Sequence, residues 1–146
     1  ARLGPPVTYL ATAVVADDDM AQRVAAHRAR RPLDWATREA TDDLPEVLRR
    51  TGGTVLVDAL GTWLAAHHDF LADDDALVRA LSGRSGDTVV VSDEVGLGVH
   101  PETPVGRRFR DRLGELNQAV ASVSDRVLLV VAGRTIELAP PEDLLR

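Results

Sequence analysis

Apolar residues gather in four short, nearly continuous runs along the chain, separated by longer polar segments. These runs cover residues Val7–Ala11, Thr54–Asp58, 88–92 and 127–132. Strands that are covered on both faces lack the alternation of apolar and polar residues found in half-exposed strands, and such strands are typical of parallel sheets. The pattern therefore predicts a parallel sheet with helices on both faces.

The segments between these runs show the spacing of helices. Helices are expected over residues 17–30, 44–50, 62–70, 73–81 and 104–123. Strands that alternate with helices indicate βαβ units. Gly133 and Arg134 separate the fourth run from the residues TIEL closely enough for a hairpin, so the last strand is expected to be antiparallel, at an edge. The predicted fold class is α/β: a mostly parallel sheet flanked by helices, in one domain over residues 1–146.

Composition narrows the class of protein. The 146 residues include 23 acidic and 17 basic side chains, a formal net charge of −6, which argues against general binding of nucleic acid. There is no cysteine, so disulfides and thiolate metal sites are excluded. No apolar stretch has the length of a membrane span. We therefore expect a cytoplasmic protein without a membrane span.

Arg2 and Leu3, followed by Gly4 and Pro5, have the pattern of a helix end, so we expect further chain upstream.

Residues 89–121 join an apolar strand, an acidic glycine loop and a basic helix. Asp93 and Glu94 open the loop, and the helix carries Arg107, Arg108, Arg110 and Arg112. Ligands of open α/β sheets bind beyond the carboxyl ends of the strands, where carboxylates can hold a metal and arginines can hold phosphate. An ordinary connection with a solvated arginine face explains the same residues. Spacing alone leaves both interpretations open.

The helix expected at residues 17–30 begins with three aspartates and ends in arginines. This order suits the helix dipole, which alone would explain both charge clusters. A second interpretation starts from His27, which lies four residues before Arg31 and next to Arg28. Arginines bind phosphate, and an imidazole can attack phosphorus. The sequence pattern leaves both interpretations open.

Three further features of the sequence can be interpreted from their local pattern. Asp58 ends the run TVLVD, as a carboxylate linked to Mg²⁺ does in nucleotide-binding strands, although an aspartate there can also cap the next turn. His67 and His68 are adjacent and so point in different directions on a helix, which predicts surface residues rather than metal ligands. Trp35 and Trp63 are expected to be packing residues, because aromatic residues are too scarce here for a stacking platform.

Several of these segments together resemble the bifunctional adenosylcobinamide kinase / adenosylcobinamide-phosphate guanylyltransferase family of cobalamin biosynthesis. The resemblance spans nearly the whole chain. It rests on YLATA at residues 9–13, DDDMAQRVAAHRARRPLDWATRE at 17–39, VLVDALGTWL at 55–64, and the loop after Ser92 followed by LLVVAG. It implies a P-loop NTPase-like (RecA-like) sheet and a homotrimer.

The resemblance also assigns an activity and site residues. Members phosphorylate adenosylcobinamide with ATP or GTP, then transfer GMP from GTP to adenosylcobinamide phosphate, with release of pyrophosphate. His27 matches the histidine that carries GMP covalently, Asp58 would help to hold Mg²⁺, and Asp93 and Glu94 would lie on the acceptor side. The positions matching GTP contacts are Ala11, Thr12, Ala13, Arg28, Ala29, Arg30, Arg31, Glu39 and Asp58.

The sequence departs from the family pattern in three places. No G-x-x-x-x-G-K-[ST] phosphate loop occurs in the 146 residues, and the resemblance places that loop about one helix upstream of Val7. Asp93 stands where the family usually has Asn. The section between Leu64 and Thr88 is shorter than in the relatives. Besides the enzyme, two alternatives stay open: a degenerate relative that serves as a nucleotide-binding or partner-binding subunit, and an unrelated P-loop-like kinase for another small molecule.

Overall fold

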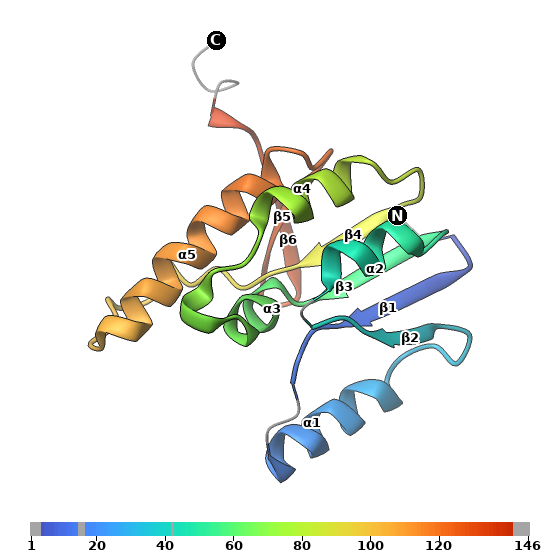
Figure 1. The fold of residues 1–146 in the computed structure, drawn as a ribbon, viewed down its shortest axis with the longest axis horizontal. Helices are drawn as coiled ribbons and strands as arrows, with labels where there is room; N and C mark the ends of the chain where they lie inside the picture. Colours follow the sequence, from blue (N-terminus) through green and yellow to red (C-terminus); the bar gives the residue numbers. More distant parts are fainter. Residues whose placement is uncertain (1–3, 15–16, 42, 142–146) are drawn as a thin grey trace.

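The computed structural model of the chain describes residues 4–14, 17–41 and 43–141. The helix end expected at Arg2 and Leu3 lies outside these residues. Figure 1 shows a sheet with most of the helices gathered over one of its faces and α1 lying apart from them. None of the described helices combines the length and the apolar character that a membrane span requires.

The main sheet has four parallel strands in the order β2-β1-β3-β4. They are β1 (Val7–Ala11), β2 (Ala36–Glu39), β3 (Thr54–Asp58) and β4 (Thr88–Val91). Three of the four apolar runs therefore form neighbouring parallel strands, which confirms the predicted βαβ organisation. The short strand β2 was not predicted, because its residues ATRE contain no apolar run; it lies at one edge of the sheet, largely exposed.

Strand register assigns the side chains to two faces. Leu10 pairs with Val57, and Val57 with Val90, so these residues share one face. That face is packed against the helices, and Leu10 and Val57 are almost fully buried. The opposite face is less covered, because Val89 and Val91 remain 36% and 39% exposed. The expectation that every strand is covered on both faces therefore does not hold for β4.

The helices are α1 (Asp18–Ala29), α2 (Leu44–Arg50), α3 (Leu60–Ala66), α4 (Asp74–Ser82) and α5 (Pro104–Ala121). The core between sheet and helices is built mainly from leucine, valine and one tryptophan, Trp63, which is 1% exposed. This confirms the predicted packing role of Trp63. The single helix predicted over residues 62–70 is wrong. The helix α3 ends at Ala66, His67 is extended, and a 3₁₀ turn, η1 (His68–Phe70), follows.

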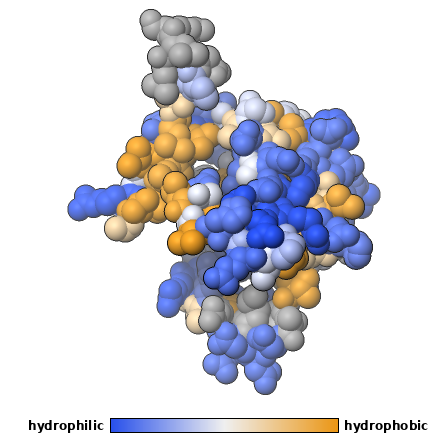
Figure 2. All heavy atoms as spheres, turned by 90° about the vertical axis from the view of Figure 1, so that its left-hand side faces the viewer, coloured by the Kyte–Doolittle hydropathy of each residue, from blue (hydrophilic) through white to orange (hydrophobic). Residues whose placement is uncertain are grey.

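The chain ends in an antiparallel hairpin of β5 (Val127–Val131) and β6 (Arg134–Leu138). Ala132 and Gly133 form its turn, both with positive φ, as a two-residue hairpin turn of the primed type requires. The predicted antiparallel pairing is confirmed. The hairpin forms a two-stranded sheet of its own and is not hydrogen-bonded to β4. Leu128, Val130 and Ile136 are therefore 47%, 64% and 59% exposed, and Figure 2 shows a hydrophobic area below the grey C-terminal residues.

Candidate functional site

Three of the predicted site residues lie in one row at the carboxyl end of the sheet. Ala11 at the end of β1 pairs with Glu39 at the end of β2 and with Asp58 at the end of β3. The arrowheads of β1 and β4 in Figure 1 point to this edge. Because ligands of parallel sheets bind beyond the carboxyl ends of the strands, this row marks the floor of a candidate site.

The helix α1 brings His27 to this row. Its Nε2 atom lies 3.7 Å from Oδ2 of Asp58, and the two side chains are 57% and 23% exposed. The chain reaches α1 directly after β1, so the last turn of the helix can return to the end of the neighbouring strand. His27 is thus accessible from solvent and also faces a carboxylate, as a nucleophile that must meet a substrate requires.

Tyr9 connects the members of the site, although the sequence did not single it out. Its hydroxyl group donates a hydrogen bond to Oδ2 of Asp58, and its ring centroid lies 5.9 Å from that of His27. The guanidinium carbon of Arg31 lies 3.2 Å from the centre of the Tyr9 ring. Burial, followed by the hydrogen bond to Asp58, raises the pKa of Tyr9 above its ordinary value. The only available signal was a single aromatic residue in the strand VTYLA, two residues before Ala11.

The basic residues at the end of α1 differ in their burial. Arg28 and Arg30 are exposed, whereas Arg31 is half-buried and donates from Nη1 to Oγ1 of Thr37 over 3.3 Å. The Nε atom of Arg31 is buried and has no hydrogen-bond partner among the described residues. A buried donor without a partner costs about 1–3 kcal/mol, so an oxyanion beside Arg31 would remove an existing penalty. This observation fits the predicted contact with phosphate.

Thr12 is inside the fold rather than on the surface of the site. Its side chain is fully buried, and its hydroxyl group donates to the carbonyl of Ala59 over 2.7 Å and accepts from the amide of Ala59 over 2.8 Å. The same hydroxyl lies 2.6 Å from that of Thr62. Thr12 thus ties the end of β1 to the turn between β3 and α3. Ala29 is exposed, and Ala13 lines a cavity of about 200 Å³ together with Val14, Thr62, Ala65 and Ala66.

The carboxylates of the site fit a magnesium ion held together with a substrate. No group of three or more histidine, aspartate or glutamate side chains that could bind a metal is found among the described residues. The backbones of Glu39 and Asp58 lie two strand spacings apart, about 10 Å, on either side of Ala11. Mg²⁺ is commonly held by one or two carboxylates and the phosphates of its substrate. Asp58 meets this description.

The acidic loop lies near the same edge of the sheet. A Cβ atom added to Gly61 in the first turn of α3 would lie 2.7 Å from Oδ2 of Asp93, so the Asp93 carboxylate is close to that turn. Glu94 is directed to its own loop, where its Oε1 atom accepts from the amide of Gly96 over 2.7 Å. The structure therefore brings Asp93, but not Glu94, against the segment that follows Asp58.

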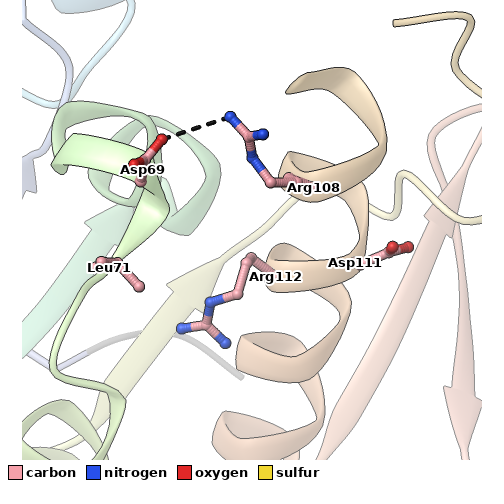
Figure 3. A pocket seen from close by; sticks show the side chains of 5 residues that line it. All are labelled: Asp69, Leu71, Arg108, Asp111 and Arg112. Atoms are coloured by element: carbon pink, nitrogen blue, oxygen red, sulfur yellow. Dashed lines mark hydrogen bonds and ion pairs between the residues drawn. The ribbon is translucent and has the colours of Figure 1, made fainter. Parts of the chain in front are cut away.

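The four arginines of α5 are paired within the protein. Arg108 contacts Asp69 over 3.4 Å, and Arg112 contacts Asp74 over 3.0 Å. Figure 3 shows Arg108 directed toward Asp69 of η1 at a cavity of about 620 Å³, which is lined by Asp69, Leu71, Arg108, Asp111 and Arg112. Arg110 contacts Asp111, and Arg107 donates to the carbonyls of Pro101 and Glu102. These contacts favour the interpretation of residues 89–121 as an ordinary connection rather than a ligand site, because each arginine already has a partner within the protein.

Comparison with known proteins agrees with the family resemblance. Residues 1–138 match the family described as "Cobinamide kinase / cobinamide phosphate guanyltransferase". The bifunctional adenosylcobalamin biosynthesis protein CobP of Pseudomonas aeruginosa is 40% identical over 149 residues, covering 94% of this chain and 85% of that protein. The protein CobU of Salmonella typhimurium, which has the same bifunctional description, is 33% identical over 92% of this chain and 86% of its own length. The chain therefore belongs to the cobinamide kinase / cobinamide phosphate guanyltransferase family.

Proposed function

We propose that this protein transfers GMP from GTP to adenosylcobinamide phosphate, and that His27 carries the guanylyl group between the two substrates. The family supports the pair of activities, kinase and guanylyltransferase. The observation that supports the role of His27 is its place: its imidazole is 57% exposed at the carboxyl edge of the sheet and faces Asp58. Arg28, Arg30 and Arg31 follow it directly and supply positive charge for a triphosphate.

The proposed reaction has two steps through one intermediate. A ring nitrogen of His27 attacks the α-phosphorus of GTP, a P–N bond forms, and the bond to the bridging oxygen breaks as pyrophosphate leaves with the electron pair. A phosphate oxygen of adenosylcobinamide phosphate then attacks the same phosphorus. The P–N bond breaks, His27 is restored, and adenosylcobinamide-GDP is released. Covalent catalysis of this kind divides one difficult transfer into two easier ones.

Asp58 would hold Mg²⁺ together with phosphate oxygens, and the ion would supply charge neutralisation on the phosphate groups. Arg31 would add a charge-assisted hydrogen bond from its free Nε donor. The row formed by Glu39, Ala11 and Asp58 would set the position of the nucleotide at the end of the sheet. The fully buried Thr12 would act indirectly, by fixing the turn after Asp58.

The kinase activity would phosphorylate the hydroxyl group of adenosylcobinamide with ATP or GTP. The family's phosphate loop, expected upstream of Val7, would bind that triphosphate through its backbone amides. We also propose that the protein acts in the cytoplasm as a homotrimer, and that Asp93 and Glu94 lie on the side of the corrinoid acceptor. The Asp93 carboxylate lies close to the first turn of α3, which supports this role for Asp93 but not for Glu94.

The test is covalent labelling of the full-length protein with GTP and Mg²⁺. GTP labelled at the α-phosphate should leave an acid-labile, base-stable label on the protein, and GTP labelled at the γ-phosphate should leave none. The variant H27N should lose the label. H68N is the matched control, because the side chain of His68 is 94% exposed and lies outside the site. A label that persists in H27N would refute the proposed intermediate.

A further inference from the structure

We infer that Tyr9 is a positioning residue of the guanylyl-transfer site, with its hydroxyl group and its ring acting on two different partners. The hydroxyl group fixes Asp58 opposite His27, and the ring supports Arg31. The predicted effects on the rate of guanylylation rest on the proposed function of His27. It adds a residue to which neither the family motifs nor the sequence pattern assigned a role.

The first partner is Asp58. The Tyr9 hydroxyl donates to Oδ2 of Asp58, which is the same oxygen that lies 3.7 Å from Nε2 of His27. A carboxylate on a free rotamer could turn this oxygen away from the imidazole. The hydrogen bond from a tyrosine that is itself 4% exposed removes this freedom, because the phenol cannot move without disturbing the sheet. The orientation of Asp58 toward His27 therefore depends on the Tyr9 hydroxyl.

The second partner is Arg31. Its guanidinium group lies over the face of the Tyr9 ring, 3.2 Å from the centroid, and is held from the side by Thr37. Thr37 and Tyr9 are paired across β2 and β1, so both supports of Arg31 belong to one row of the sheet. Stacking on an aromatic face holds a guanidinium in a fixed plane without occupying its donors. The ring of Tyr9 thus keeps Arg31 ready for an anion.

The position of Tyr9 explains how one residue serves both partners. Tyr9 and Asp58 lie on the same face of the sheet, because Ala11, two residues after Tyr9, pairs with Asp58. The face toward the helical core carries Leu10 and Val57 instead. Tyr9 is therefore in contact with the site and is not part of the main core cluster.

The inference separates into two measurable effects. Y9F keeps the ring and removes only the hydroxyl group, so it should lower the rate constant of His27 guanylylation by about 10-fold or more. The GTP concentration for half-maximal rate should change by less than about 2-fold, because Arg31 keeps its support. Y9L removes the hydroxyl group and the aromatic ring, so it should also lower the rate constant of guanylylation. Because Arg31 then loses its support, the GTP concentration for half-maximal rate should rise by on the order of 10-fold.

The matched control is T54V in the full-length protein. Thr54 is buried on β3 at the opposite end of the sheet, and its hydroxyl group donates to the carbonyl of Gly4 over 2.7 Å. This variant tests the general cost of losing a buried hydroxyl group from the sheet. Its kinetics should equal those of the wild type, even where its melting temperature falls.

A measurement without substrate keeps the inference separate from the proposed function. In histidine-selective ¹⁵N spectra of the nucleotide-free protein, the ring signals of His27 should shift in Y9F and remain unchanged in T54V. Unchanged His27 signals together with wild-type guanylylation kinetics in Y9F would overturn the inference. Absence of any label on the wild-type protein would refute the proposed function, and the spectra would still decide whether Tyr9 positions the Asp58 and His27 pair.

Discussion

Two clusters of arginines in this protein look alike in the sequence and differ in the structure. The cluster on α5 (Arg107, Arg108, Arg110 and Arg112) has acidic side chains or backbone carbonyls of the same protein as partners. The cluster after His27 has two exposed arginines, and Arg31 keeps one buried donor without a partner among the described residues. A basic cluster is available for a ligand when the fold leaves its donors unused, and the number of arginines does not reveal this.

The largest expected difference between the two regions is in the rate of guanylylation after Asp58, beside His27, or Asp111, on α5, is replaced by asparagine. D58N should slow guanylylation of His27 by on the order of 100-fold, because the amide cannot supply the negative charge that faces the imidazole and that we propose holds Mg²⁺. The fold should persist, since the amide oxygen can still accept from Tyr9. D111N on α5 is the control, and rapid-quench labelling measures both. Equal rates in D58N and D111N would show that Asp58 has no special place in the site.

The arginines allow a direct comparison of function with stability. R31Q should lower kcat/KM for GTP by about 10-fold to 100-fold, the loss expected for one charge-assisted hydrogen bond. R112Q should leave kcat/KM unchanged and lower the free energy of unfolding by about 1–3 kcal/mol, because the half-buried Asp74 loses its partner. Steady-state kinetics and urea unfolding test the pair. The reverse pattern, with R112Q losing activity and R31Q losing only stability, would exchange the roles of the two clusters.

Much of the architecture follows from the sequence because the apolar runs are long enough to specify buried strands. Val7–Ala11 and Thr54–Asp58 were recognised with their final bounds. The strand β2 was missed, because ATRE has no apolar period and becomes a strand only by pairing with β1. The break at His67 was missed too. The apolar spacing continues past Ala66, while the backbone closes the helix through the hydrogen bond from His67 to Leu64.

The candidate site was predictable as a set of motifs but not as a geometry. The motifs pointed to His27, Arg31 and Asp58, and the structure brings these residues together. Which arginine is stacked, and on which ring, depends on the register between β1 and β2, which no local pattern contains. Tyr9 was missed for this reason, since a single aromatic residue in a strand is more often part of a core. The acceptor-side role of Glu94 stays a prediction, and in the structure its Oε1 atom accepts from the amide of Gly96 in the same loop.

Tyr9 also gives the site a measurable pH dependence. Burial and the hydrogen bond to Asp58 raise the pKa of Tyr9 above its ordinary value of about 10. Its contribution to stability is therefore fully present below pH 10, the unfolded value, and is lost as the pH rises through the folded pKa. Tyr9 is the only tyrosine among the 146 residues, so tyrosinate absorbance of this chain reports it alone. The midpoint should lie above that of the urea-unfolded chain, and equal midpoints would contradict the buried contact with Asp58.

The smallest effects concern two glycines on the helices that flank the sites. G114A on α5 should raise the free energy of unfolding by about 0.5–1 kcal/mol, since nothing lies within 4 Å of the added methyl group. G61A on α3 should give no such gain, because its methyl group would meet the Asp93 carboxylate at 2.7 Å. Urea unfolding of both variants compares them. A stabilisation of equal size in G61A would show that Asp93 does not lie against α3.

The central claim is that the bond-forming residue is His27, at the carboxyl edge of the sheet and beside Asp58. The most direct measurement is peptide mapping by mass spectrometry of the full-length protein after brief reaction with GTP and Mg²⁺, without corrinoid. We predict one guanylyl adduct, on the peptide containing His27, which disappears when adenosylcobinamide phosphate is added. An adduct on His67, His68 or His100, or on any other peptide away from α1, would contradict this claim.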